Sequence, residues 1–96
     1  MAKGYWVATY RSVSDPEALA RYGARAAEAI QALGGRALAR GRPLRVYESV
    51  APQRCVILEF ESVAAAIAAY ESDAYSQVRS ILQGAVEREI LILEGV

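Results

Sequence analysis

Residues 12–35, SVSDPEALARYGARAAEAIQALGG, decide the fold because they encode one helix with both of its ends marked. Asp15 is a natural N-cap, Pro16 suits the first helical position, and Glu17 favours the positive end of the helix dipole. The Gly34–Gly35 pair supplies a left-handed stop. Apolar residues recur at three- and four-residue spacing and predict one buried stripe, formed by Leu19, Tyr22, Ala26, Ile30 and Leu33.

Segments rich in β-branched and aromatic residues flank this helix and predict strands. The first strand, residues 3–11 (KGYWVATYR), places Trp6, Ala8 and Tyr10 together on one face. A second begins after the helix and is interrupted at Gly41–Pro43, where a break or bulge is expected. The remaining predicted strand segments are RALAR (36–40), its continuation LRVYESV (44–50), RCVILEFE (54–61) after a turn at Pro52, and EREILILEGV (87–96).

A second helix is predicted between the last two strands. Ser62 caps its first part, VAAAIAAY (63–70), whose small side chains allow close approach to the sheet. A break at Ser72–Asp73 restarts the helix as AYSQVRSILQGA (74–85). The restarted part has an apolar face formed by Tyr75, Val78, Leu82 and Ala85.

The order of the predicted elements is β-α-β-β-α-β, in a single domain that spans residues 1–96. This order predicts an α+β fold of the ferredoxin-like, split βαβ type. Four antiparallel strands then carry both helices on one face. The strand order 4-1-3-2 of such a sheet places residues 36–40 at one of its edges.

The strands are more apolar than a sheet with one solvated face requires. The chain is 54% apolar, and CVILEF (55–60) and ILIL (90–93) put large side chains on both faces. A bare apolar sheet face in water is an association site. We therefore expect a homodimer in which two copies stack sheet to sheet around a two-fold axis and form a dimeric α/β barrel.

The composition excludes several classes of function. The chain has no histidine and one cysteine, Cys55, so we expect no metal site, no haem and no other cofactor. Its net charge is zero, and RCVILEFE (54–61) lacks the aromatic pattern of RNA-binding sheets, so no nucleic-acid partner is expected. The segment GGRALARGRP (34–43) lacks the ending of a phosphate loop.

No targeting or membrane segment is expected either. The first ten residues do not resemble a signal peptide, and no apolar run approaches the roughly 18–20 residues that span a bilayer. We expect a cytoplasmic protein without a membrane partner, and the ten arginines against one lysine indicate a bacterial source. Residues 1–54 carry charge +5 and residues 55–96 carry −5, which suits docking between copies but also arises by chance.

Short motifs along the whole chain come in an order that resembles a known family. They are KGYW (3–6), DPEA (15–18), Tyr22, GGR-x-L-x-RG (34–41), Glu48, R-x-V-I-L-E-F (54–60), S-V-x-A-A (62–66), Y-x-S-x-x-Y (70–75) and the closing EGV. Together they resemble the domain-of-unknown-function family 1330 of the dimeric α/β-barrel superfamily. The resemblance implies a ferredoxin-like protomer and a sheet-to-sheet dimer, and it implies no established reaction. Members of the family often have an arginine near the position that Leu82 occupies here. This chain has an arginine one turn earlier, at Arg79.

Four arginines within residues 36–45 raise the question of an anion site. Strand alternation puts Arg36 and Arg40 on one face of their segment, where arginines at a sheet edge discourage unwanted pairing. Alternatively, Arg40 or Arg54 points into the cleft between sheet and helices and binds a carboxylate. A third possibility is ion pairing across the dimer, with partners among Glu48, Glu59 and Glu61.

Tyrosines offer a second set of candidate ligand-binding residues. Several phenols that converge on one cleft can line a pocket for a small aromatic or carbonyl compound, although they can equally fill the boundary between core and solvent. Glu59 and Asp73 can act as acid or base if buried beside an arginine, and Asp73 can instead cap a helix. The complete set of hypothetical ligand-binding residues is Tyr10, Tyr22, Arg40, Arg54, Glu59, Tyr70, Asp73, Tyr75 and Arg79.

Two classes of function remain open. One is a small-molecule site between sheet and helices, which can belong to a cofactor-free enzyme whose chemistry uses Tyr, Arg, Asp or Glu. The other is a non-catalytic binding or assembly module. The sequence identifies no reaction and no substrate.

Overall fold

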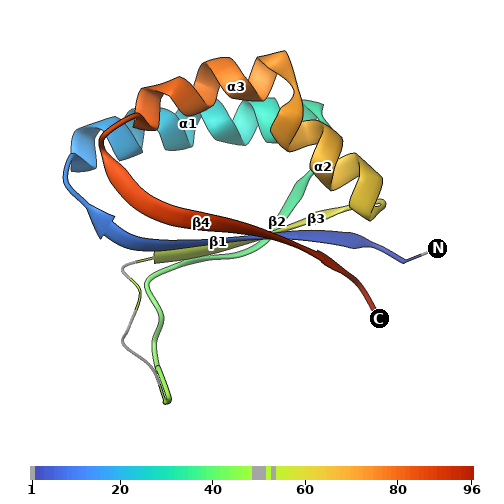
Figure 1. The fold of residues 1–96 in the computed structure, drawn as a ribbon, viewed down its shortest axis with the longest axis horizontal. Coiled ribbons are helices and arrows are strands. Elements are labelled where there is room, and N and C mark those ends of the chain that lie inside the picture. The colour runs from blue at the N-terminus through green and yellow to red at the C-terminus, as the bar shows by residue number, and fades with distance from the viewer. Residues whose placement is uncertain (1, 49–51, 53) are drawn as a thin grey trace.

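The computed structural model describes residues 2–48, 52 and 54–96. Four strands form one antiparallel sheet, and the helices form a second layer over one of its faces (Figure 1). This is the ferredoxin-like arrangement that the order of elements predicts. The elements are β1 (Gly4–Val13), α1 (Pro16–Ala32), β2 (Arg36–Gly41), β3 (Arg54–Phe60), α2 (Val63–Glu71), α3 (Asp73–Arg79), the 3-10 turn η1 (Ser80–Leu82) and β4 (Val86–Glu94).

Helix α1 has the ends that its sequence predicts. The Asp15 carboxylate accepts a hydrogen bond from the Ala18 backbone N–H at 3.1 Å, and Pro16 occupies the first turn. After the helix, Gly34 adopts the left-handed conformation with φ of 94°. The predicted apolar stripe faces inward, with Tyr22 and Ile30 among its buried members.

The second helical segment is broken at Ser72, as predicted. The Ser72 hydroxyl donates to the Ala69 carbonyl oxygen at 2.7 Å and accepts from the Tyr75 backbone N–H at 3.1 Å. One side chain therefore ends α2 and begins α3. This cap also fixes the position of Tyr75, whose side chain is fully buried.

Helix α2 lies directly against the sheet. Ala66 and Ala69 are 0% and 2% exposed, and their small side chains let the helix pack closely on the sheet. At the start of β1, a Cβ atom on Gly4 would lie 2.3 Å from the Ser62 carbonyl oxygen. Only glycine fits this approach, so β1 passes close to the start of α2.

The sheet has the strand order β2-β3-β1-β4, with β2 at one edge as predicted. Residues paired across neighbouring strands share a face of the sheet. Tyr10 of β1 is paired with Arg54 of β3 on one side and with Arg88 of β4 on the other. These three side chains therefore form one row on the face that carries the helices.

Strand β2 differs from its predicted form in two ways. It ends at Gly41, and residues 42–48 form no strand, so the predicted continuation through 44–50 is wrong for the part that the structure describes; residues 49 and 50 lie outside the described residues. In addition, the pairing with β3 shifts by one residue at Leu38. This bulge reverses the alternation, so the prediction that Arg36 and Arg40 share a face is wrong.

The face without helices carries apolar side chains, as the strand composition predicts. Val7, Ile57 and Leu91 are aligned across β1, β3 and β4. Leu91 is 46% exposed and its neighbour Leu93 54%. We call this surface the open face. None of the helices in the described ranges is both long enough and apolar enough to cross a membrane.

Candidate functional site

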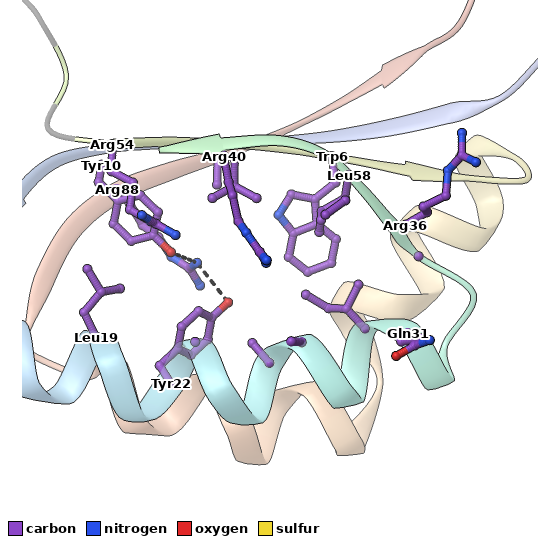
Figure 2. A pocket seen from close by; sticks show the side chains of 18 residues that line it. Trp6, Tyr10, Leu19, Tyr22, Gln31, Arg36, Arg40, Arg54, Leu58 and Arg88 are labelled. Atoms are coloured by element: carbon purple, nitrogen blue, oxygen red, sulfur yellow. Dashed lines mark hydrogen bonds between the residues drawn. The ribbon is translucent and has the colours of Figure 1, made fainter. Parts of the chain in front are cut away.

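A pocket of about 320 Å³ lies between α1 and the helix-facing side of the sheet (Figure 2). Small residues create this hollow: Ala8 lies on the sheet side, and Gly23 and Ala26 lie on the helix side. A Cβ atom on Gly23 would contact nothing within 4 Å, so this part of α1 borders open space. Exposed residues of α1 and of edge strand β2 also line the pocket, which places its mouth between these two elements. The remaining apolar wall is formed by Trp6, Leu19, Ile30, Val56 and Leu58.

At the inner end of the pocket, Arg88 binds three tyrosine hydroxyl groups. Its Nη1 donates to Tyr10 at 3.1 Å and to Tyr22 at 3.2 Å, and its Nη2 donates to Tyr75 at 3.0 Å. The Tyr22 and Tyr75 hydroxyl groups also share a hydrogen bond. We call these four residues the tyrosine–arginine cluster. The cluster joins β1, α1, α3 and β4. The oxygens that accept hydrogen bonds from the Arg88 guanidinium are all phenol oxygens, and none belongs to a carboxylate.

Burial keeps two phenols of this cluster, Tyr10 and Tyr22, protonated. Loss of solvent raises the pKa of Tyr22, and the neighbouring Tyr75 raises it further. Burial also raises the pKa of Tyr10, although Arg88 opposes part of this effect. Burial disfavours the charge on Arg88, but the surrounding phenol oxygens outweigh it and raise the guanidinium pKa. At physiological pH, Arg88 is therefore a cation in contact with Tyr10 and Tyr22 as neutral phenols.

Two further arginines reach the pocket from the sheet. Arg40 of β2 points toward α1, and Arg54 of β3 is paired with Tyr10 (Figure 2). Arg36, by contrast, turns away and donates to Glu59 at 3.2 Å on the open face. Among the described residues, no aspartate or glutamate lines the pocket. The pocket is therefore electropositive and can accept an anion.

Tyr70 and Arg79 lie at a different depression, on the far side of Arg88. The Arg79 guanidinium lies over the Tyr70 ring, 4.9 Å from its centroid. Both residues line a second, more open pocket together with Arg11 and Arg88. The structure therefore brings this pair together but places it outside the pocket beneath α1.

The two candidate carboxylates lie away from both sets. Glu59 is on the open face, where it accepts hydrogen bonds from Tyr5 at 3.0 Å and from Arg36. Asp73 is exposed in the first turn of α3, where a negative charge favours the helix dipole. Of the residues that the sequence suggested for ligand binding, the structure brings together Tyr10, Tyr22, Arg40, Arg54 and Tyr75.

Arg88 is the central residue that the sequence reasoning missed. A signal was present, because Arg88 shares the alternation of Ile90 and Ile92 in β4 and therefore points to the core side. A charged residue at an apolar position of a strand indicates a buried partner. For a metal ion the chain offers little: within the described ranges, no three Cys, Asp or Glu side chains gather at one place.

Residues 3–96 match the family described as domain of unknown function (DUF1330). The chain belongs to the DUF1330 family. The match covers nearly all of the chain, so the fold and the tyrosine–arginine cluster both lie inside the family domain. Among curated proteins, none has a sequence that matches this DUF1330 chain.

Solved structures share its fold. A protein of unknown function from Rhodopseudomonas palustris is 20% identical with a TM-score of 0.75, over 99% of this chain and 83% of that one. SnoaB, a cofactor-independent oxygenase from Streptomyces nogalater, is 14% identical with a TM-score of 0.70, over 97% and 92%. A dimeric ferredoxin-like protein of unknown function from Thermobifida fusca is 12% identical with a TM-score of 0.59, over 97% and 91%. At these identities the likeness shows the ferredoxin-like fold.

Proposed function

We propose that this DUF1330 protein binds a small organic molecule in the pocket beneath α1, and that it does so as a homodimer. The observation that carries the proposal is the convergence of Arg40, Arg54 and the tyrosine–arginine cluster on a pocket of about 320 Å³ with apolar walls. Small-molecule sites combine an apolar lining with a few convergent polar groups in this way. The arginine-rich composition, with its single cysteine, supports a bacterial cytoplasmic location within the same proposal.

The open face supports the dimer. Leu91 and Leu93 are about half exposed, and Ile57 and Val7 continue the apolar surface across the sheet. A second copy stacked on this face would cover these side chains, while the helices and the pocket remain on the outside. The dimeric protein from Thermobifida fusca has the same fold.

Catalysis without a cofactor is the finer form of the proposal. SnoaB shows that this fold accommodates a cofactor-independent oxygenase, which is an analogy of fold and not of site. The described pocket lining contains no carboxylate or thiol. Any reaction here would rest on stabilisation of negative charge by arginine and tyrosine donors and on the reactivity of the substrate itself. A non-catalytic binding or assembly module is the second candidate, which the apolar open face favours.

Native mass spectrometry of gently purified protein tests both parts. We expect a dimer that retains a small mass, and we expect Arg54→Ala to lose this mass without loss of the dimer. Leu91→Lys on the open face is the matched variant, because it should give a monomer by light scattering and leave the pocket intact. A wild-type monomer at micromolar concentration would refute the dimer. A dimer without retained mass would favour the assembly module.

A further inference from the structure

The polar groups of the pocket beneath α1 are almost all hydrogen-bond donors. Arginine side chains have no acceptor atom, and three of them, Arg40, Arg54 and Arg88, face the pocket. The Tyr10 hydroxyl accepts from Arg88, which leaves its own proton for another acceptor. Gln31 offers an amide from α1. A ligand that satisfies this pocket must therefore bring acceptor oxygens and negative charge.

Arg40 and Arg54 are placed to hold one anionic group together. Arg40 is paired with Val56 of β3, and Arg54 lies two residues before Val56 on the same face. Such diagonal positions on neighbouring strands are roughly 7–8 Å apart, within reach of two long side chains that converge on one group. The planar fork of arginine matches a carboxylate. The pocket lies along the middle of α1 rather than at its N-terminus, so it lacks the backbone N–H groups that phosphate sites use.

The inner end of the pocket has a different requirement. Both N–H groups of the Arg88 Nη1 are used by Tyr10 and Tyr22, and Nη2 donates to Tyr75. This arginine is therefore largely satisfied, and the Tyr10 hydroxyl, which lines the pocket, keeps its own proton for a ligand. One neutral acceptor, such as a carbonyl oxygen, fits this end. Tyr10 lies two strands from β2, roughly 10 Å from the edge where Arg40 is located.

We infer that the ligand is an organic acid with an apolar body, whose carboxylate binds Arg40 and Arg54 and whose distal carbonyl oxygen binds the Tyr10 hydroxyl. The body would lie between Ala26 of α1 and Leu58 of β3. This inference rests on the proposed function and specifies its substrate class.

Three probes separate the two polar ends. The first is 4-oxo-4-phenylbutanoate, which has both a carboxylate and a ketone. Its primary carboxamide keeps the ketone and removes the charge, and 4-phenylbutanoate keeps the charge and removes the ketone. Isothermal titration calorimetry measures affinity for each probe. Trp6 is the only tryptophan of the chain and lines the pocket, so a change in its fluorescence locates the binding.

The variants Arg40→Gln and Arg54→Gln test the carboxylate end. Each should weaken binding of the keto acid by about ten- to a hundredfold, as expected for a hydrogen bond to a charged group, and leave the carboxamide unaffected. Arg25→Gln is the matched control, because Arg25 is exposed on the side of α1 away from the pocket. Tyr10→Phe should weaken the keto acid and leave 4-phenylbutanoate unchanged. Circular dichroism of every variant checks that the fold is retained.

The outcomes distinguish the inference from the function on which it rests. Equal affinities of the acid and the carboxamide would overturn the carboxylate assignment while pocket binding stands. Equal affinities of the keto acid and 4-phenylbutanoate would overturn the role of Tyr10. If no probe binds, Trp6 fluorescence does not respond and the purified protein retains no mass, the proposed function itself fails.

Discussion

The buried phenols of the tyrosine–arginine cluster predict a loss of stability in alkaline solution. In the unfolded chain, Tyr10 and Tyr22 ionise near pH 10. Burial raises the pKa of both in the folded protein. Above pH 10 the unfolded state therefore releases protons that the folded state retains. Stability is fully present below the unfolded pKa and falls as the pH rises from there toward the folded pKa.

The size of this loss of stability follows from proton linkage. Each phenol that stays protonated only in the folded state lowers the free energy of unfolding by about 1.4 kcal/mol per pH unit above pH 10. Tyr22 contributes over the widest range, because both burial and its neighbour Tyr75 raise its pKa. Tyr10 adds a similar slope until its own folded pKa is reached. The combined slope is about 2.7 kcal/mol per unit, which is large beside a typical domain stability of about 5–15 kcal/mol.

Urea unfolding followed by Trp6 fluorescence between pH 8 and about pH 11.5 measures this slope. Tyr22→Phe should be less stable at every pH and should also lose about 1.4 kcal/mol per unit of the alkaline slope. Tyr47→Phe, at a 77% exposed position, is the control for removal of a phenol. The reasoning is refuted if wild-type stability is flat across this range, or if Tyr22→Phe keeps the full slope.

Three shorter predictions concern other parts of the chain. Gly4→Ala should lower the free energy of unfolding by about 1–3 kcal/mol, because its Cβ would clash with the Ser62 backbone. Gly23→Ala on α1, where the added Cβ meets nothing, should raise the free energy of unfolding by up to about 1 kcal/mol. Equal urea midpoints of the two variants would contradict this. Asp73→Asn should cost less than about 1 kcal/mol and leave binding of the keto acid unchanged in calorimetry, and a loss of binding would return Asp73 to the site. The Cys55 thiol, half-buried on β3 beside the open face, should react slowly with iodoacetamide in the dimer and faster on dilution; a rate independent of concentration would argue against burial by a second copy.

Local signals made most of the fold predictable. The cap at Asp15 and the break at Ser72 are set by side chains a few residues from the groups they bind, so their sequence neighbourhood contains the information. The bulge at Leu38 is different. It is a feature of the pairing between β2 and β3, whereas the alternation of RALAR is regular by itself. The face of Arg40 could therefore be decided only by the paired strand.

The site shows the same division between local and long-range information. Tyr10, Tyr22, Tyr70 and Tyr75 were considered together because they lie on elements predicted to enclose one cleft. The structure joins three of them through Arg88 and places Tyr70 beside Arg79. Arg88 was not expected, because its partners are 13 to 78 residues away and none of them is acidic. Sequence reasoning pairs a buried arginine with an aspartate or glutamate, and Arg88 instead donates its hydrogen bonds to tyrosine hydroxyls. Glu59 was considered because a carboxylate buried beside an arginine can act as acid or base; it does lie beside Arg36, but on the open face and outside the pocket.

The different contacts of α1 and α2 with the sheet explain why the hollow lies beneath α1. Alanines bring α2 into contact with the sheet. The tyrosine–arginine cluster instead lies between the strands and helices α1 and α3, and its hydrogen bonds join them. The tyrosine–arginine cluster thus keeps α1 apart from the sheet and contributes hydrogen-bond donors to the pocket. The two roles can be separated, because phenylalanine and methionine preserve much of the bulk without the polar atoms. Tyr10→Phe combined with Arg88→Met should keep the hollow, and with it the binding of 4-phenylbutanoate, while the keto acid loses its added affinity. Loss of both ligands together would show that the polar contacts themselves hold α1 away from the sheet.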